Sequence, residues 1–147
     1  MSFTTAELEL RAEIEELVTR YATAIDHRDW ELFRSVFADD AHIDYGPLMG
    51  VWDDAAVFTE FMAQAHAAAG RSIHRMTNVV VARGGALAAV TYGDSIILDA
   101  ANEANYDHGA AAYDDTFVRT DAGLKIASRK TSVVLYEKLT SNLAVGL

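Results

Sequence analysis

Asp26, in "RYATAIDHRDW", and His74, in "HRMTN", are the residues whose types most directly indicate proton transfer in this chain. A carboxylate beside a histidine accepts the hydrogen bond of one ring nitrogen, fixes the tautomer, and stabilises the imidazolium that forms when the other nitrogen takes a proton. That is the minimal unit of a general base. The two residues therefore indicate proton abstraction, provided that the fold brings them together.

Two tyrosines could complete such a site. Tyr21 precedes Asp26 by five residues, about 140° around a helix, so both side chains can border one wide apolar face. Tyr45 lies in "HIDYG", on a separate segment. Hydroxyls placed there could donate hydrogen bonds to a substrate carbonyl or help to protonate a leaving hydroxyl group.

Each of these residues also has a purely structural interpretation. Asp26 could cap the helix that begins near Asp29, or end in solvent. The tyrosines could be core residues whose hydroxyls reach a partner. His74 could simply open a strand, and Arg129, in "LKIASRK", could point outward from a strand exposed on one face.

The elements that must position these residues begin with helices. Thr4 and Glu7 fit a capping box, and apolar residues recur at helical spacing until the helix ends near Asp26. "DHRDWELFRSVF" predicts a second helix capped by Asp29, followed by a turn and a short strand in "DDAHIDYG". A third helix is expected from Asp54 to about residue 68.

After "AAGRS" the pattern changes to β-rich runs, and His74 stands near the start of the first one. The runs are "IHRMTNVVVA", "LAAVTYGDSIIL", "AAAYDDTFVRT" and "LKIASRKTSVVLY", with "RGGA" and "TDAG" as hairpin turns. Helices followed by an antiparallel sheet predict one α+β domain over residues 1–147, in which a curved sheet wraps the helices. A cavity between the two layers is the default ligand site.

Other types of site lack their parts. There is no cysteine, no G-x-S-x-G elbow and no phosphate-binding glycine motif, and "ARGGAL" is a turn. The histidines show neither i,i+4 pairing nor an H-E-x-x-H pattern; they are His27, His42, His66, His74 and His108. Adjacent aspartates near turns or strand faces fit solvated charge; these are Asp39 and Asp40, Asp53 and Asp54, and Asp114 and Asp115. We expect no metal and no cofactor.

Charge and hydropathy narrow the choice of partners. A formal charge of −10 opposes binding to nucleic acid and to anionic membranes. No apolar run approaches the roughly 18 residues that span a bilayer, and the start of the chain lacks the pattern of an export signal. We therefore expect a protein of the cytoplasm without nucleic-acid or membrane partners.

Two segments carry a resemblance to a known family. "RYATAIDHRDWELFRSVFADDAHIDYG" resembles the opening of scytalone dehydratase, and "HRMTN" resembles the H-x-x-T-N of lindane dehydrochlorinase. Both belong to the SnoaL-like branch of the nuclear transport factor 2-like superfamily, and the likeness extends over roughly residues 10 to 136. It implies a cone-shaped α+β barrel, whose N-terminal helices pack in a curved, mainly antiparallel sheet around a hydrophobic pocket.

The resemblance also implies roles for individual residues. Asp26 and His74 match the dyad in which the aspartate orients the histidine that moves a proton. Tyr45 matches a tyrosine that helps a water molecule to polarise the substrate carbonyl, and Tyr21 matches a tyrosine five residues before the aspartate of bile acid 7-alpha-dehydratase. Arg129 matches an arginine that faces the departing anion in lindane dehydrochlorinase.

The chain departs from the scytalone dehydratase pattern on later strands. "TYGDSIILDA" lacks the second active-site histidine, so Ser95, Ile97 and Asp99 are the expected pocket residues, with Asp94 on the other face if the strand alternates. Near Tyr113, also an expected pocket residue, the serine and asparagine of that enzyme are not evident. A different substrate is therefore expected.

The function that follows is a cofactor-independent lyase that eliminates water from a hydrophobic cyclic small molecule. Three alternatives stay open: a double-bond isomerase, a polyketide cyclase, and a non-catalytic ligand-binding domain. We also expect a homo-oligomer, a dimer or a trimer, because "SVVLY" offers apolar residues on the sheet.

Overall fold

The computed structural model describes residues 2–142. The elements follow one another as α1 (Thr5–His27), α2 (Trp30–Ser35), β1 (Phe37–Asp44), α3 (Gly46–Met49), β2 (Val51–Trp52), α4 (Ala55–Ala65), β3 (Ala69–Val81), β4 (Ala88–Asp99), β5 (Asn105–Thr120) and β6 (Gly123–Thr140). Helices precede a sheet, as the sequence predicts.

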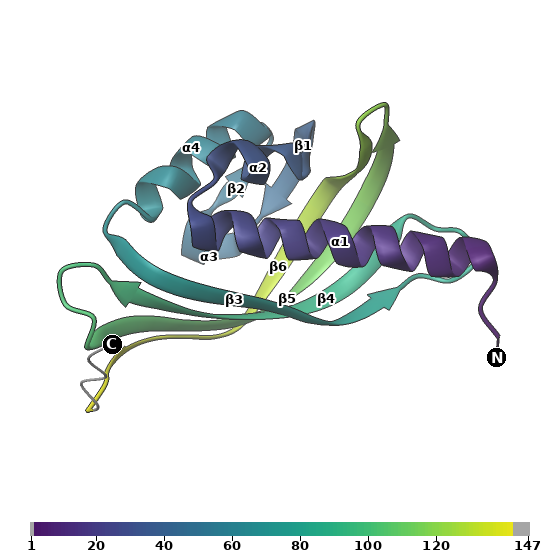
Figure 1. The fold of residues 1–147 in the computed structure, drawn as a ribbon. Coiled ribbons are helices and arrows are strands. Elements are labelled where there is room, and N and C mark those ends of the chain that lie inside the picture. The colour runs from purple at the N-terminus through teal and green to yellow at the C-terminus, as the bar shows by residue number, and fades with distance from the viewer. Residues whose placement is uncertain (1, 143–147) are drawn as a thin grey trace.

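The strands form one six-stranded sheet in the order β2-β1-β6-β5-β4-β3. Neighbouring strands run antiparallel except β1 and β6, which are parallel. The long α1 lies across one face of the sheet, and the short helices gather at one end with β1 and β2 (Figure 1). This mixed, open sheet confirms the predicted α+β cone with mainly antiparallel strands.

Local sequence signals set the ends of the first two helices. Thr4 accepts a hydrogen bond from the Glu7 amide at 3.2 Å, and the Glu7 carboxylate accepts one from the Thr4 amide at 2.9 Å. Asp29 caps α2 by accepting from the amide of Leu32. Between the helices Arg28 adopts a left-handed conformation with φ 57°, which lets the chain turn. The predicted caps are confirmed.

The core lies at the end of the molecule where the short helices meet the sheet. Phe33, Phe37 and Phe58 have ring centroids between 5.4 and 5.8 Å apart and no exposed surface. Each such side chain contributes about 1.5–3 kcal/mol through its burial. The inner face of α1 packs into the same core with Ile14, Leu17, Val18, Tyr21 and Ile25.

The chain enters the sheet earlier than the sequence pattern predicts. α4 ends at Ala65 rather than near Ala68, and β3 begins at Ala69. Pairing with another strand is the cause, because Ala69 pairs with Asp99 of β4. His74 consequently lies inside β3 and not at its start, which corrects the prediction.

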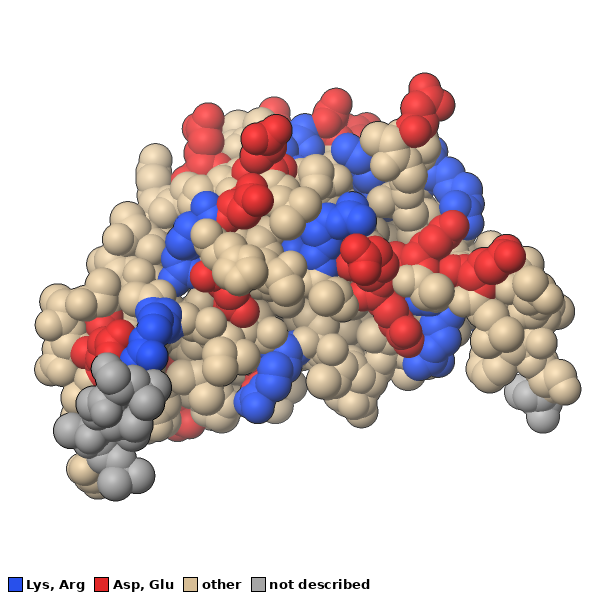
Figure 2. Space-filling model, in the orientation of Figure 1, with Lys and Arg blue, Asp and Glu red and all other residues tan. Residues whose placement is uncertain are grey.

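One face of the molecule carries charges of both signs. Figure 2 shows acidic and basic side chains interspersed on this face. Ion pairs of the structure include Arg119 with Glu13 at 2.9 Å and Arg83 with Glu7 at 3.1 Å. This face therefore lacks the continuous basic strip to which phosphate backbones bind.

A β-bulge explains the asparagine of "HRMTN". The pairing of β3 with β4 shifts register between Thr77 and Val80, and Asn78 within that interval has φ 51°. A left-handed conformation is tolerated by glycine and asparagine but opposed by a β-branched side chain. Asn78 therefore allows the backbone of β3 to form the bulge that follows His74 in the chain.

Replacing Asn78 tests this explanation. We expect Asn78→Val to lower the free energy of unfolding by about 1–2 kcal/mol, because valine resists the left-handed conformation. Asn78→Gly should change it little, since glycine adopts this backbone without steric cost. Urea denaturation of both variants measures the difference, and equal stabilities would contradict it.

Candidate active site

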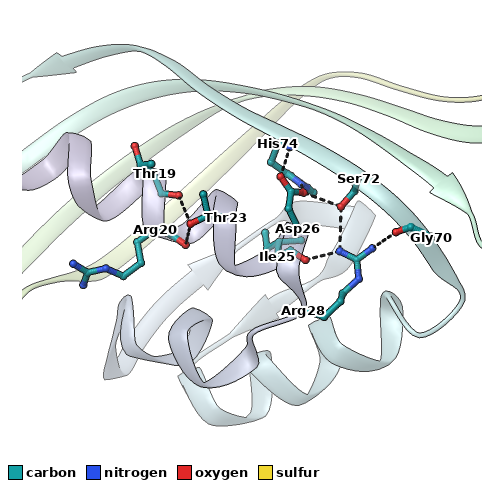
Figure 3. Close-up of polar contacts among 9 residues, drawn as sticks. All are labelled: Thr19, Arg20, Thr23, Ile25, Asp26, Arg28, Gly70, Ser72 and His74. Carbon is teal, nitrogen blue, oxygen red and sulfur yellow. Dashed lines mark hydrogen bonds and ion pairs between the residues drawn. The ribbon is translucent and has the colours of Figure 1, made fainter. Parts of the chain in front are cut away.

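The Asp26 carboxylate, at the end of α1, binds β3 through three hydrogen bonds (Figure 3). It accepts from His74 Nδ1 at 2.7 Å, from the His74 amide at 2.8 Å and from Ser72 Oγ at 2.7 Å. Because an ionised carboxylate only accepts, Nδ1 carries the ring hydrogen. In the neutral ring, Nε2 is then the nitrogen with the free lone pair.

Burial raises the pKa of Asp26, but the hydrogen bonds from His74 and Ser72 outweigh it, so its pKa lies below the ordinary value. The carboxylate is therefore ionised at neutral pH. The His74 and Asp26 side chains are only 11% and 18% exposed, which strengthens their interaction over that of a surface pair.

Arg28 supports this pair from behind, and the sequence interpretation missed it. Its guanidinium donates to Ser72 Oγ at 3.1 Å, to the Gly70 carbonyl at 2.6 Å and to the Ile25 carbonyl. Ser72 can therefore accept from Arg28 while it donates to Asp26 (Figure 3). For Ser72 the sequence did carry a signal. This serine lies two residues before His74 on the same strand, so the two side chains share a face.

Tyr21 and Tyr45 meet at their hydroxyl groups, 2.6 Å apart. One hydroxyl must donate to the other, so this contact uses one of their two hydrogens, and the Tyr113 side chain also forms a hydrogen bond with Tyr21. Burial, with a smaller contribution from the neighbouring Tyr45 and Tyr113, raises the pKa of Tyr21 well above its ordinary value. The Tyr21 hydroxyl thus keeps its hydrogen at neutral pH.

Arg129 lies behind these tyrosines. Its guanidinium donates to both carboxylate oxygens of Asp115 at 2.8 Å, and neither side chain is exposed. The same guanidinium lies 4.3 Å from the ring centre of Tyr21 and 4.5 Å from that of Tyr113. Solvated charge is therefore the wrong interpretation of Asp115, and an outward position is the wrong one for Arg129.

A cavity of about 750 Å³ opens between the helices and the inner face of the sheet. It is bordered by His74 and by Tyr21, Tyr45 and Tyr113, whereas Asp26 and Arg129 stand behind this first layer. The cavity therefore brings the potential base and the hydroxyl donors to one space.

Small residues on the inner face make room for the cavity. Gly93 pairs with Ala111, and Ser95 pairs with Gly109, in the middle of the sheet. A Cβ atom on Gly93 would stand 2.7 Å from the Tyr113 ring, so only glycine allows that ring its place. The missed sequence signal was the presence of small residues at alternate positions: Gly93 and Ser95 on β4, and Gly109 and Ala111 on β5.

The pocket residues predicted on β4 all border the cavity, namely Ser95, Ile97 and Asp99. Ser95 pairs directly with His74, so the two share the inner face. Asp94 also borders the cavity, but its carboxylate binds Arg75. Because Asp94 pairs with Arg75 next to the pair of Ser95 with His74, its side chain belongs to the opposite face. The Asp99 carboxylate caps the next turn by accepting from the amide of Ala101.

Within residues 2–142, no three histidine or acidic side chains gather in a way that could hold a metal ion. No helix in that part of the chain is both long and apolar enough to cross a membrane.

The family model of the SnoaL-like domain matches residues 6–130. The chain belongs to this SnoaL-like family. An uncharacterized protein of Mycobacterium tuberculosis, Rv2910c, is 29% identical to it over 127 residues, which are 84% of this chain and 85% of the relative.

Solved structures share the fold of this SnoaL-like domain. A candidate scytalone dehydratase from Novosphingobium aromaticivorans superposes with a TM-score of 0.81 at 15% identity, covering 99% of this chain and 100% of the other. The hexachlorocyclohexane dehydrochlorinase LinA-type3 from Novosphingobium barchaimii gives 0.72 at 20% identity, with 95% and 97% covered. At such identities the likeness shows the fold alone.

The buried ion pair gives a stability prediction. Arg129→Met should lower the free energy of unfolding by about 3–5 kcal/mol, because it leaves the Asp115 carboxylate buried without its partner. The double variant Arg129→Met, Asp115→Leu should recover much of this loss. Arg71→Met, which breaks the exposed pair with Glu103, should have little effect. Urea denaturation measures all three, and a single variant as stable as the double one would contradict the prediction.

The dyad gives a prediction for acid stability. Since the folded state lowers the pKa of Asp26, its ionisation stabilises the protein fully above the pKa of the unfolded chain, about 4. That contribution is lost as the pH falls through the lower folded pKa. The stability difference between wild type and Asp26→Asn should therefore be constant near neutrality and shrink in acid. Thermal unfolding across this range measures it, and parallel curves for both proteins would refute it.

Proposed function

We propose that this SnoaL-like protein is a cofactor-independent lyase that eliminates water from a hydrophobic cyclic small molecule. The observation that carries the proposal is the hydrogen bond from His74 Nδ1 to Asp26, with the rest of the imidazole at the cavity. This arrangement leaves Nε2 free to take a proton from carbon. The apolar walls, which include Ile25, Met62 and Ile97, suit a ring system.

The proposed elimination is complete without an added reagent. His74 Nε2 takes a proton from the carbon beside a carbonyl group, and the electrons of that C–H bond form the new double bond. The C–O bond at the next carbon breaks, and its electron pair leaves with the oxygen. The imidazolium then returns the proton to the departing hydroxide, directly or through a hydroxyl group, so the products are an unsaturated ring and water.

The tyrosine pair would supply the donor for this step. A hydroxyl group of the cluster that Tyr21 and Tyr45 form with Tyr113 would donate to the carbonyl oxygen, on which negative charge develops as the proton leaves. The positive charge of Arg129 beneath Tyr21 opposes the effect of burial on the pKa of that tyrosine and so makes it a better donor. Arg129 would therefore act through the tyrosines. Their rings lie between its guanidinium and the cavity, so it would not touch a departing anion directly, as the family resemblance implied.

The protein would work as a homo-oligomer of the cytoplasm. Val134, in "SVVLY", is 78% exposed although it lies within β6, which fits a contact between copies through the sheet. Size measurement in solution would give the number of copies.

Removal of the base tests the proposal. We expect His74→Ala to lower turnover of a cyclic β-hydroxy ketone by about 10²- to 10⁴-fold, because a positioned general base contributes that much. Asp26→Asn should lower turnover as well, since it removes the carboxylate that fixes the tautomer. Mass spectrometry of a panel of such ketones detects the loss of one water molecule.

The chain offers a matched control. His42 and Asp53 form a second histidine–aspartate pair, exposed and outside the cavity lining. His42→Ala and Asp53→Asn should therefore leave turnover unchanged. Unchanged turnover in His74→Ala would reject the base. A product of unchanged mass that still requires His74 would instead indicate an isomerase or a cyclase, and ligand binding without any turnover would indicate a binding domain.

A further inference from the structure

His66 is a second histidine at the cavity, and the dyad does not use it. It is the C-cap of α4, its Nδ1 lies 2.8 Å from the Met62 carbonyl oxygen, and its ring centre lies 5.7 Å from that of Trp30. A carbonyl oxygen only accepts, so Nδ1 must carry a hydrogen. The polar atom left for an occupant of the cavity is therefore Nε2.

The charge state of His66 determines what Nε2 can do. Burial lowers the pKa of this imidazole, and the nearby positive charge of Arg28 adds to the effect, against the opposing hydrogen bond to Met62. The ring is thus neutral at neutral pH, and Nε2 presents a lone pair rather than a hydrogen. Within residues 2–142 no protein group donates a hydrogen bond to this atom.

We propose that His66 Nε2 accepts a hydrogen bond from a hydroxyl group of the ligand, at a point separate from the atom that His74 deprotonates. The inference rests on the proposed function in that the ligand is the substrate of the same cavity. His74 projects from β3 and His66 follows α4, so two imidazole rings from different elements border the cavity. A ring compound with two hydroxyl groups would suit both histidines. One hydroxyl group would leave in the elimination, and the other would remain and donate to His66.

Three substitutions of His66 separate this role from a structural one. The contact of Nδ1 with Met62 could by itself make His66 useful as a cap of α4. His66→Asn retains a polar atom near the position of Nδ1 and loses the acceptor at Nε2. His66→Gln does the reverse, and His66→Phe keeps only the ring against Trp30.

Binding of naphthalene diols and their monomethyl ethers, measured by titration calorimetry, tests the proposal. For the diol that loses most affinity on methylation, we expect roughly 3- to 10-fold weaker binding to His66→Asn and His66→Phe, the range for one neutral hydrogen bond. His66→Gln should bind within about twofold of wild type. Naphthalene itself should bind all four proteins alike, because it has no donor.

Other patterns overturn the proposal. If His66→Asn keeps full affinity and His66→Gln loses it, the ring acts only as the cap of α4. If methylation leaves wild-type binding unchanged, or if no diol binds, the cavity does not hold a hydroxyl group at His66. These outcomes differ from failure of the proposed lyase, because the binding contrast requires no turnover and should persist in His74→Ala.

Discussion

The carboxylate of Asp26 is the contact on which the geometry of the site depends. It joins the end of α1 to the middle of β3, because the amide, the ring of His74 and the hydroxyl of Ser72 all donate to it. One interaction therefore closes the helix on the sheet and orients the imidazole. Any shift of α1 along β3 would disturb the packing and the tautomer together, so stability and chemistry are coupled at this residue.

A buried ion pair, Arg129 with Asp115, lies behind the tyrosines that line the cavity. The Arg129–Asp115 pair has no exposed side chain, which is costly unless the two ions are well matched, and here both oxygens of the carboxylate are bound. Tyr21 and Tyr113 cover the guanidinium and separate it from the cavity. The positive charge can therefore influence the hydroxyl groups without forming an ion pair with a ligand.

The dyad could be predicted because it depends on motifs, whereas its supports depend on tertiary structure. Asp26 and His74 lie in recognisable segments, and the caps at Thr4 and Asp29 follow local rules. Nothing local distinguishes Asp115 from its neighbour Asp114; only pairing with Arg129 across β5 and β6 shows which one is buried. Likewise, the start of β3 is set by a partner strand that lies some thirty residues away, beyond the reach of sequence periodicity.

The cavity itself has a cost that the rest of the fold must offset. Glycine, serine and alanine at the centre of the inner face give up the hydrophobic burial that larger side chains would provide there. The compensation lies directly beside the cavity, where the aromatic cluster around Phe33 and Phe58 is fully buried and the Phe58 ring centre lies 5.5 Å from that of Tyr45 in the cavity wall. The fold thus places a densely packed core against an open cavity, and the dyad, which joins the end of α1 to β3, stands between them. There it receives the rigidity of the core on one side and access to a ligand on the other.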